Sequence, residues 1–169
     1  MRSLALAFCL LALPSGWESS LADGTQTPSE ECAGTISGRV FFFGSRRWPN
    51  APVYLLDLEQ SAPLRQLVRK TSRRLRSLGA GAPSTHDVAA EFYNKVAGLV
   101  PKLPRISKVR ADKVGAYEFG NVATGKRYYL VAMDVGEDGV FYAAAETPLL
   151  HPRQQLKLDI REINLWYAE

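Results

Sequence analysis

The sequence predicts a mainly β domain, a sandwich of antiparallel sheets with about seven strands and an inserted α-helical hairpin. Short segments of alternating apolar and polar residues recur at roughly ten-residue spacing, with polar turns between them. Between the second and third of these segments the apolar spacing changes from that of a strand to that of a helix. The length of the chain fits a single domain that can bury a hydrophobic core.

The N-terminus predicts export. Arg2 is followed by an apolar run over residues 4–13, and residues 20–22 (Ser-Leu-Ala) place small side chains where a signal peptidase reads them. We therefore expect residues 1–22 to be a signal peptide. The run is about half as long as the ~20 residues that a bilayer span needs. The mature chain is expected to be secreted or periplasmic, with no transmembrane segment.

The mature chain divides into a leader and a domain. Residues 23–34 are polar and contain glycine and proline, so we expect a flexible leader. Cys32 is the one cysteine left after cleavage and cannot form an intramolecular disulfide. The sandwich domain is expected over residues 35–169, interrupted by the hairpin at 60–104.

The first two strands are indicated by period-two patterns. Ile36, Val40 and Phe42 fall on one face of the first strand, and Val53 and Leu55 begin the second. After the hairpin the same pattern returns in segments that begin near residues 106, 116, 128, 140 and 156. In the segment from residue 128 we expect Tyr128, Leu130 and Ala132 to point inward.

The hairpin is indicated by two apolar stripes at helical spacing. Leu64, Val68 and Leu75 belong to the first stripe, which ends in a Gly-rich stretch at residues 79–83. Ser84 and Asp87 resemble a helix N-cap and its acidic N3 partner. The second stripe comprises Val88, Phe92, Val96, Leu99 and Val100.

Several motifs resemble carboxypeptidase regulatory-like domains, which have the transthyretin-type (prealbumin-like) fold. The matching stretches are residues 36–40 (ISGRV), 50–55 (NAPVYL), 111–119 (ADKVGAYEF), 122–125 (VATG), 128–132 (YYLVA) and 156–160 (LKLDI). The resemblance implies a non-catalytic accessory module. Because the family joins its second and third strands by a short link, it also implies that the hairpin is removable without loss of the sandwich.

No group of residues predicts catalysis, and we expect no catalytic residue, metal site or cofactor. His86 and His151 are not at zinc spacing from each other or from a cysteine. Ser84, His86 and Asp87 stand within four consecutive positions, whereas the members of a catalytic triad converge from separate segments. A helix cap explains these three residues better.

The first helix of the hairpin is strongly basic, with six Lys or Arg residues and no acid between Gln60 and His86. At 100° per residue, Arg65, Arg69, Arg73 and Arg76 fall within about 80° of one another beside the apolar stripe. Three interpretations stay open: a solvated face partly offset by Asp87 and Glu91, a surface that docks on anionic lipid or envelope polymer, and a contact for an acidic protein. A net charge of +4 and the lack of a recognised motif argue against nucleic acid.

Two tryptophans suggest an alternative partner. Trp48 lies in a turn beside Arg46 and Arg47, and Trp166 follows the last strand. Exposed rings at such positions could stack on sugars, although such rings more often close the ends of the core. The sequence thus predicts a non-catalytic exported binding or cell-envelope scaffolding module, with a carbohydrate-binding accessory module as the alternative.

Overall fold

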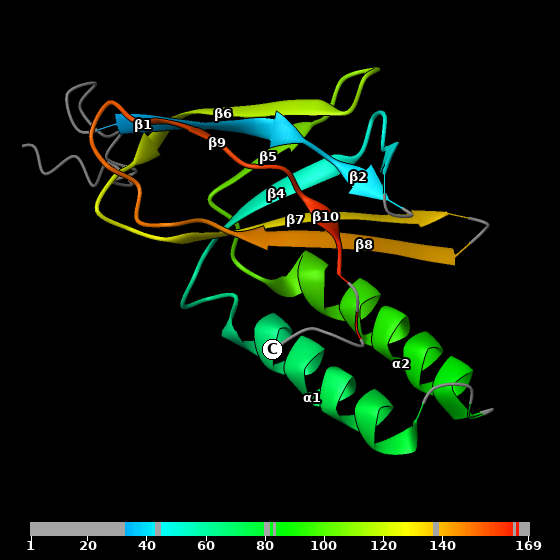
Figure 1. Ribbon diagram of the computed structural model, residues 1–169. Coiled ribbons are helices and arrows are strands. Elements are labelled where there is room, and N and C mark those ends of the chain that lie inside the picture. The colour runs from blue at the N-terminus through cyan, green and yellow to red at the C-terminus, as the bar shows by residue number, and fades with distance from the viewer. Residues whose placement is uncertain are drawn as a thin grey trace, which may run out of the picture.

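The computed structural model describes residues 33–42, 45–79, 82, 84–136, 139–163 and 165. This part of the chain is mainly β, with two sheets facing each other and two helices below the larger sheet (Figure 1). The predicted β class is confirmed. The seven-strand transthyretin-type topology is not, because the described residues form ten strand segments in three sheets.

The smaller sheet has the order β6-β1-β9. Its central strand β1 (Ala33–Arg39) pairs antiparallel with β6 (Ala116–Ala123) and parallel with β9 (Gln155–Lys157). Ala33 and Gly34, expected in the flexible leader, belong to β1 and are buried. The predicted signal peptide at residues 1–22 and Cys32 lie outside the described residues.

The larger sheet has five antiparallel strands in the order β10-β8-β7-β4-β5. A separate two-stranded pair joins β2 to β3. The bounds are β2 (Phe41–Phe42), β3 (Arg46–Arg47), β4 (Pro52–Asp57), β5 (Ser107–Arg110), β7 (Tyr128–Gly136), β8 (Gly139–Glu146) and β10 (Arg161–Glu162).

The first core lies between the two sheets. Ile36, Val40, Val53 and Leu55 are each at most 1% exposed there, as the period-two pattern predicts. The inward side chains of β7 are Tyr128, Leu130 and Ala132, which confirms the predicted face of that strand.

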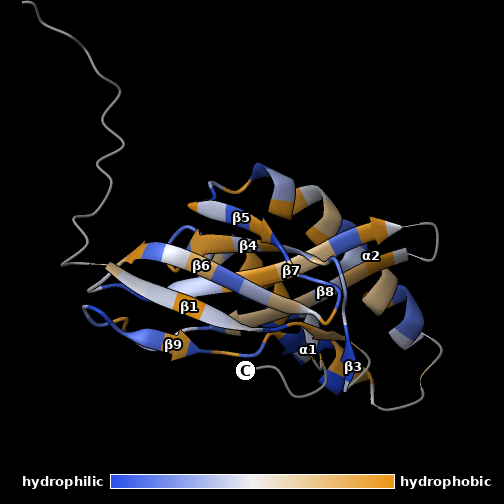
Figure 2. Cartoon of the chain, turned by 90° about the horizontal axis from the view of Figure 1, so that it is seen from above, coloured by the Kyte–Doolittle hydropathy of each residue, from blue (hydrophilic) through white to orange (hydrophobic). Residues whose placement is uncertain are grey.

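The helices bury the other face of the larger sheet and form a second core. Leu56 of β4 and Tyr129, Val131 and Met133 of β7 join the apolar stripes of both helices there. The central parts of β4 and β7 are therefore buried on both sides, and Figure 2 shows orange stretches in each strand. The hairpin is thus one of three packed layers and shares its core with β4, β7 and β8.

The helix ends follow local rules. Helix α1 (Ala62–Leu78) has Pro63 in its first turn, where a missing N–H breaks no helical hydrogen bond. It ends before Gly79, whose φ of 79° favours glycine. Helix α2 (Ser84–Leu99) continues into the 3₁₀ helix η2 (Val100–Lys102). Ser84 is the first residue of α2, and Asp87 lies in its first turn as expected.

Candidate functional site: a basic face on helix α1

Helix α1 divides into a buried face and a basic face. Leu64, Val68, Thr71, Ser72 and Leu75 are buried. At 100° per residue, the direction opposite this group is occupied by positions 66, 69, 70 and 73. Because the apolar side holds the helix against the sheet, these four positions point away from the protein.

Gln66, Arg69, Lys70 and Arg73 line a shallow surface hollow of about 450 Å³, which we call the basic hollow. All four residues are exposed. Three cations lie within little more than one helical turn, so their positive potentials add. The basic hollow can hold an anionic group and surround it with guanidinium and ammonium donors.

The cations of the basic hollow lack acidic partners within the described part of the chain. Of the six basic residues on α1, Arg65 and Arg74 pair with carboxylates, and no described carboxylate lies within ion-pair distance of the other four. Like charges at i,i+4, such as Arg69 and Arg73, destabilise an isolated helix by roughly 0.2–0.5 kcal/mol per pair. The charge of the hollow is therefore available to a partner.

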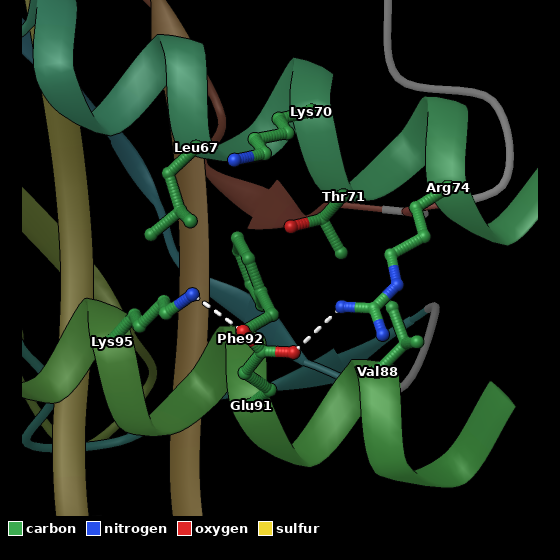
Figure 3. Close-up of a pocket in the computed structure, with 8 residues that line it drawn as sticks. All are labelled: Leu67, Lys70, Thr71, Arg74, Val88, Glu91, Phe92 and Lys95. Carbon is green, nitrogen blue, oxygen red and sulfur yellow. Dashed lines mark hydrogen bonds and ion pairs between the residues drawn. The ribbon is translucent and has the colours of Figure 1, made fainter. Parts of the chain in front are cut away.

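Glu91 of α2 pairs with none of the four predicted arginines, Arg65, Arg69, Arg73 and Arg76. Its carboxylate accepts a hydrogen bond of 2.8 Å from Arg74 and bonds Lys95 on its other side (Figure 3). These two cations lower the pKa of Glu91, with the Lys95 hydrogen bond as the largest cause. Lys70 lines the groove between the helices that is drawn in Figure 3, but it is not bonded to Glu91.

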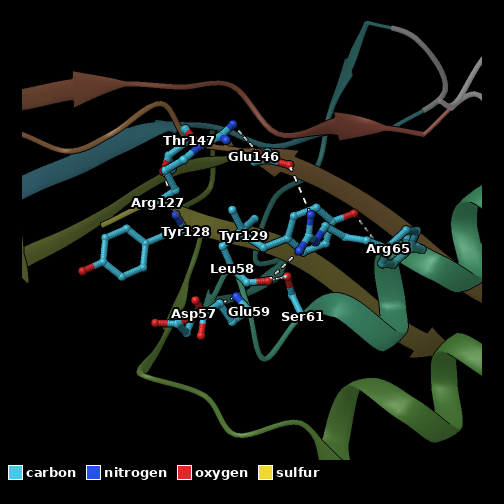
Figure 4. Close-up of polar contacts among 11 residues, drawn as sticks. Asp57, Leu58, Glu59, Ser61, Arg65, Arg127, Tyr128, Tyr129, Glu146 and Thr147 are labelled. Carbon is cyan, nitrogen blue, oxygen red and sulfur yellow. Dashed lines mark hydrogen bonds and ion pairs between the residues drawn. The ribbon is translucent and has the colours of Figure 1, made fainter. Parts of the chain in front are cut away.

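Arg65 differs from the other three predicted arginines. Its Nη2 donates to the Leu58 carbonyl at 3.0 Å, and its Nη1 lies 3.9 Å from Oε2 of Glu146. Glu146 of β8 also pairs with Arg127, so one carboxylate joins the helix to the sheet (Figure 4). The side chain of Arg65 is only 24% exposed. We assign Arg65 to the attachment of α1, whereas the sequence grouped it with Arg69, Arg73 and Arg76.

Arg76 is exposed in the last turn of α1 but does not line the basic hollow. A cation at this end interacts favourably with the helix dipole. Of the four predicted arginines, the structure places two, Arg69 and Arg73, at the hollow. Gln66 and Lys70 were missed, although the direction opposite the apolar stripe could have indicated both.

Trp48 is buried rather than presented to solvent. Its side chain is 8% exposed and packs in the first core, with ring centroids 6.0 Å from Phe42 and 5.9 Å from Phe141. Both aromatic neighbours occupy space that a stacked sugar would need, so the core-closing interpretation fits Trp48. Trp166, the other residue suggested for sugar stacking, lies outside the described residues.

A second hollow, of about 370 Å³, is electrostatically mixed. Its lining includes Asp57, Glu59, Lys126 and Arg127. Asp57 and Lys126 lie 3.8 Å apart, and Arg127 pairs with Glu146. Its charges therefore compensate one another, unlike those of the basic hollow.

The two histidines do not belong to any group of metal-ligating side chains in the described part of the chain. His86 and His151 are both exposed, and the His151 backbone N–H donates to Gln154 at 2.9 Å. Among the described residues, no group of three His, Cys, Asp or Glu side chains converges as a metal site would require.

In the same described part, no helix combines the length and hydropathy of a membrane span.

Comparison with known proteins finds no matching family model and no matching curated protein. The resemblance to carboxypeptidase regulatory-like domains is therefore not confirmed. Solved structures similar to this chain include the TIE protein of Bacillus anthracis (8% identity, TM-score 0.37) and a form of BcpA, the major pilin subunit of Bacillus cereus (13%, 0.38). The pilus backbone protein RrgB of Streptococcus pneumoniae is a third (11%, 0.30).

These similarities cover 77%, 78% and 76% of this chain, respectively. The chain spans 17%, 30% and 40% of the length of the three proteins. At such identities and TM-scores they indicate neither the partner nor the activity of this chain.

Proposed function

We propose that this chain is an exported, non-catalytic binding module that attaches to an anionic component of the cell envelope through the basic hollow on α1. The observation that carries the proposal is the group of Arg69, Lys70 and Arg73, which lacks an acidic partner among the described residues. An acidic protein partner and a solvated face remain the competing interpretations.

The rigid mounting of the basic hollow supports a binding role. Leu64, Val68 and Leu75 are at most 5% exposed, and Arg65 ties the first turn of α1 to Leu58 and Glu146. A helix held in this way presents its cations with less loss of conformational freedom on binding than a flexible basic loop would. The like-charge repulsion within the helix is also relieved when an anion binds.

The test is retention on a phosphate-bearing cellulose matrix, read as the salt concentration needed for elution. Replacing Arg69, Lys70 and Arg73 together by Gln should lower that concentration strongly and leave the melting temperature equal or slightly higher. The matched control replaces Lys102, Arg105 and Lys113 by Gln, which removes the same charge from other exposed positions.

Equal loss of retention in both triple variants would show a general charge effect and contradict a dedicated site. Retention that does not respond to salt and survives the α1 substitutions would instead favour the carbohydrate-binding alternative. In that case the Trp166→Ala variant should lose binding.

The exported part of the proposal depends on residues 1–22. Intact-mass measurement of protein recovered from the exporting host should give a chain that begins at Asp23. A full-length chain retained in the cytosol would contradict export and leave the binding proposal to be judged by the matrix test alone.

A further inference from the structure

Building on the proposed function, we infer that the partner is a linear polyanion that lies along α1, with anionic groups separated by hydroxyl-bearing units, and not the surface of a lipid bilayer. The inference depends on three features: the direction of the apolar face of α1, the spacing of its cations, and the shape of the basic hollow.

The apolar face of α1 is already occupied. A basic amphipathic helix binds a bilayer by burying its apolar face at the level of the headgroups. Here Leu64, Val68 and Leu75 are packed in the second core against the sheet and α2. Among the described residues of α1, Leu78 is the only exposed large apolar side chain, at 38%. A bilayer would therefore meet cations without the apolar contact that makes such helices bind membranes.

The cations follow the helix axis. Arg69 and Arg73 are separated by a rise of about 6 Å, and Arg76 lies a further 4.5 Å or so along the axis. All three directions fall within about 60° when the helix is viewed along its axis. A chain with one anionic group about every 5 Å can meet a cation at each turn. A single small anion would use only part of this row.

The basic hollow fits an extended polyanion better than it fits the flat surface of a membrane. The shallow hollow, of about 450 Å³, lies between Arg69, Arg73 and the neighbouring Gln66 and Lys70. An extended polymer can lie along this shallow hollow and contact its side chains in succession. Arginine binds carboxylate or phosphate oxygens in a two-pronged geometry, and the Gln66 amide offers both a donor and an acceptor to an uncharged hydroxyl.

The experiment compares oligogalacturonates of two, four and eight units, polyphosphate of matched charge, and vesicles containing about one third phosphatidylglycerol in phosphatidylcholine. Binding is measured by calorimetry for the soluble chains and by co-sedimentation for the vesicles. The intact protein should bind the four-unit chain at least about tenfold more tightly than the two-unit chain, because the row spans several charges.

The variants distinguish the contribution of the cations to binding from the contribution of the uncharged Gln66 amide. Replacing Arg69, Lys70 and Arg73 by Gln should weaken binding of the eight-unit chain at least about tenfold, and the Lys102, Arg105 and Lys113 control should change it less than about threefold. Gln66→Ala leaves the net charge unchanged and should weaken binding of oligogalacturonate about threefold, with little effect on polyphosphate.

The outcomes also separate this inference from the proposed function. In one outcome the protein binds vesicles, the α1 variant loses this binding, and neither soluble chain shows length-dependent binding. This outcome would contradict a linear polyanion as the partner but would still support an anionic partner. Polyphosphate binding without oligogalacturonate binding would overturn the hydroxyl-bearing part of the inference. If no probe binds at low salt, the proposed function itself is wrong.

Discussion

At the scale of single residues, a close backbone approach requires glycine at position 38. A Cβ added to Gly38 would lie 1.9 Å from the carbonyl oxygen of Leu158. That carbonyl also accepts the Tyr117 hydroxyl at 2.6 Å, and the Leu158 N–H donates to Ser37 at 2.8 Å. Three segments thus meet at one point, and the smaller sheet has no room there for a side chain.

Gly38→Ala should destabilise the protein by at least about 3 kcal/mol, because the obstructing atom belongs to the backbone and β1 must move away from the 156–158 segment. Gly98→Ala is the matched control. Its added Cβ meets nothing within 4 Å, and alanine is the better residue in a helix by about 0.5–1 kcal/mol. Urea unfolding of both variants measures the difference; equal stabilities would show that the strands adjust without strain.

At the scale of elements, β7 links the two cores. All six residues from Tyr128 to Met133 are buried, and alternate ones belong to the first and second core. Continuous apolar runs of this kind are typical of strands covered on both faces. Period-two reasoning identified Tyr128, Leu130 and Ala132 as inward and left the opposite face without a partner. The hairpin is that partner.

Replacing residues 60–104 by a short Gly/Ser loop should therefore prevent cooperative folding, contrary to the expectation from the sequence resemblance. It would expose Leu56, Tyr129, Val131 and Met133 together. The expected product binds a hydrophobic dye and melts without a sharp transition. A cooperative melt with unchanged β-type circular dichroism would restore the hairpin to the status of an insertion.

A point substitution tests the same coupling without deletion. Phe92 is 1% exposed, and its ring centroid lies 5.7 Å from that of Tyr142 on the sheet. Phe92→Ala should cost about 3–5 kcal/mol. The measurement uses a variant that keeps Trp48 as its only tryptophan, so that fluorescence reports on the first core. The unfolding midpoints given by fluorescence and by helical circular dichroism should fall together. A shift of the helical signal alone would show that the two cores unfold separately.

At the scale of the whole molecule, buried tyrosines occur in both cores. Tyr117 lies in the first core, and Tyr129 and Tyr142 in the second, where their hydroxyls are 3.2 Å apart. Burial is the largest cause that raises the pKa of each of these three phenols. Both layers of packing therefore keep the tyrosines neutral.

The stability of the protein should consequently fall as the pH rises above about 10, the ordinary pKa of tyrosine. Below that pH both states hold the phenolic protons, and the stabilising contribution is complete. Above it the unfolded chain releases protons that the folded chain retains, so each such group lowers the free energy of unfolding by about 1.4 kcal/mol per pH unit until its folded pKa is reached.

Chemical unfolding at a series of alkaline pH values measures this slope. Tyr117→Phe should lose about 1 kcal/mol near pH 8, where a hydrogen bond is missing, and show a shallower decline at high pH. Ultraviolet titration of the folded protein supplies the independent check. Ionisation of all its tyrosines near pH 10 would contradict the proposed cause.

Periods of two and 3.6 residues are local properties of the chain, so most helices and strands, and the apolar side of many of them, could be predicted without the fold. Ile36, Val53 and Phe92 could be assigned to a core from spacing alone, and the cations of α1 could be counted. Which of those cations are available to a partner depends on contacts between segments that are distant in the sequence. Arg65 forms an ion pair with Glu146, eighty-one positions along the chain, and Glu91 forms ion pairs with Arg74 and Lys95.

The same limit explains Trp48 and the hairpin. A turn position suggested an exposed ring, but Phe141 from a distant strand packs against it. The hairpin has no local signal for its partner, since the face that it covers is formed only when β4, β7 and β8 pair. Local periodicity sets which side of an element is apolar, whereas the pairing of segments distant in sequence sets what that side touches and which charges remain open to solvent.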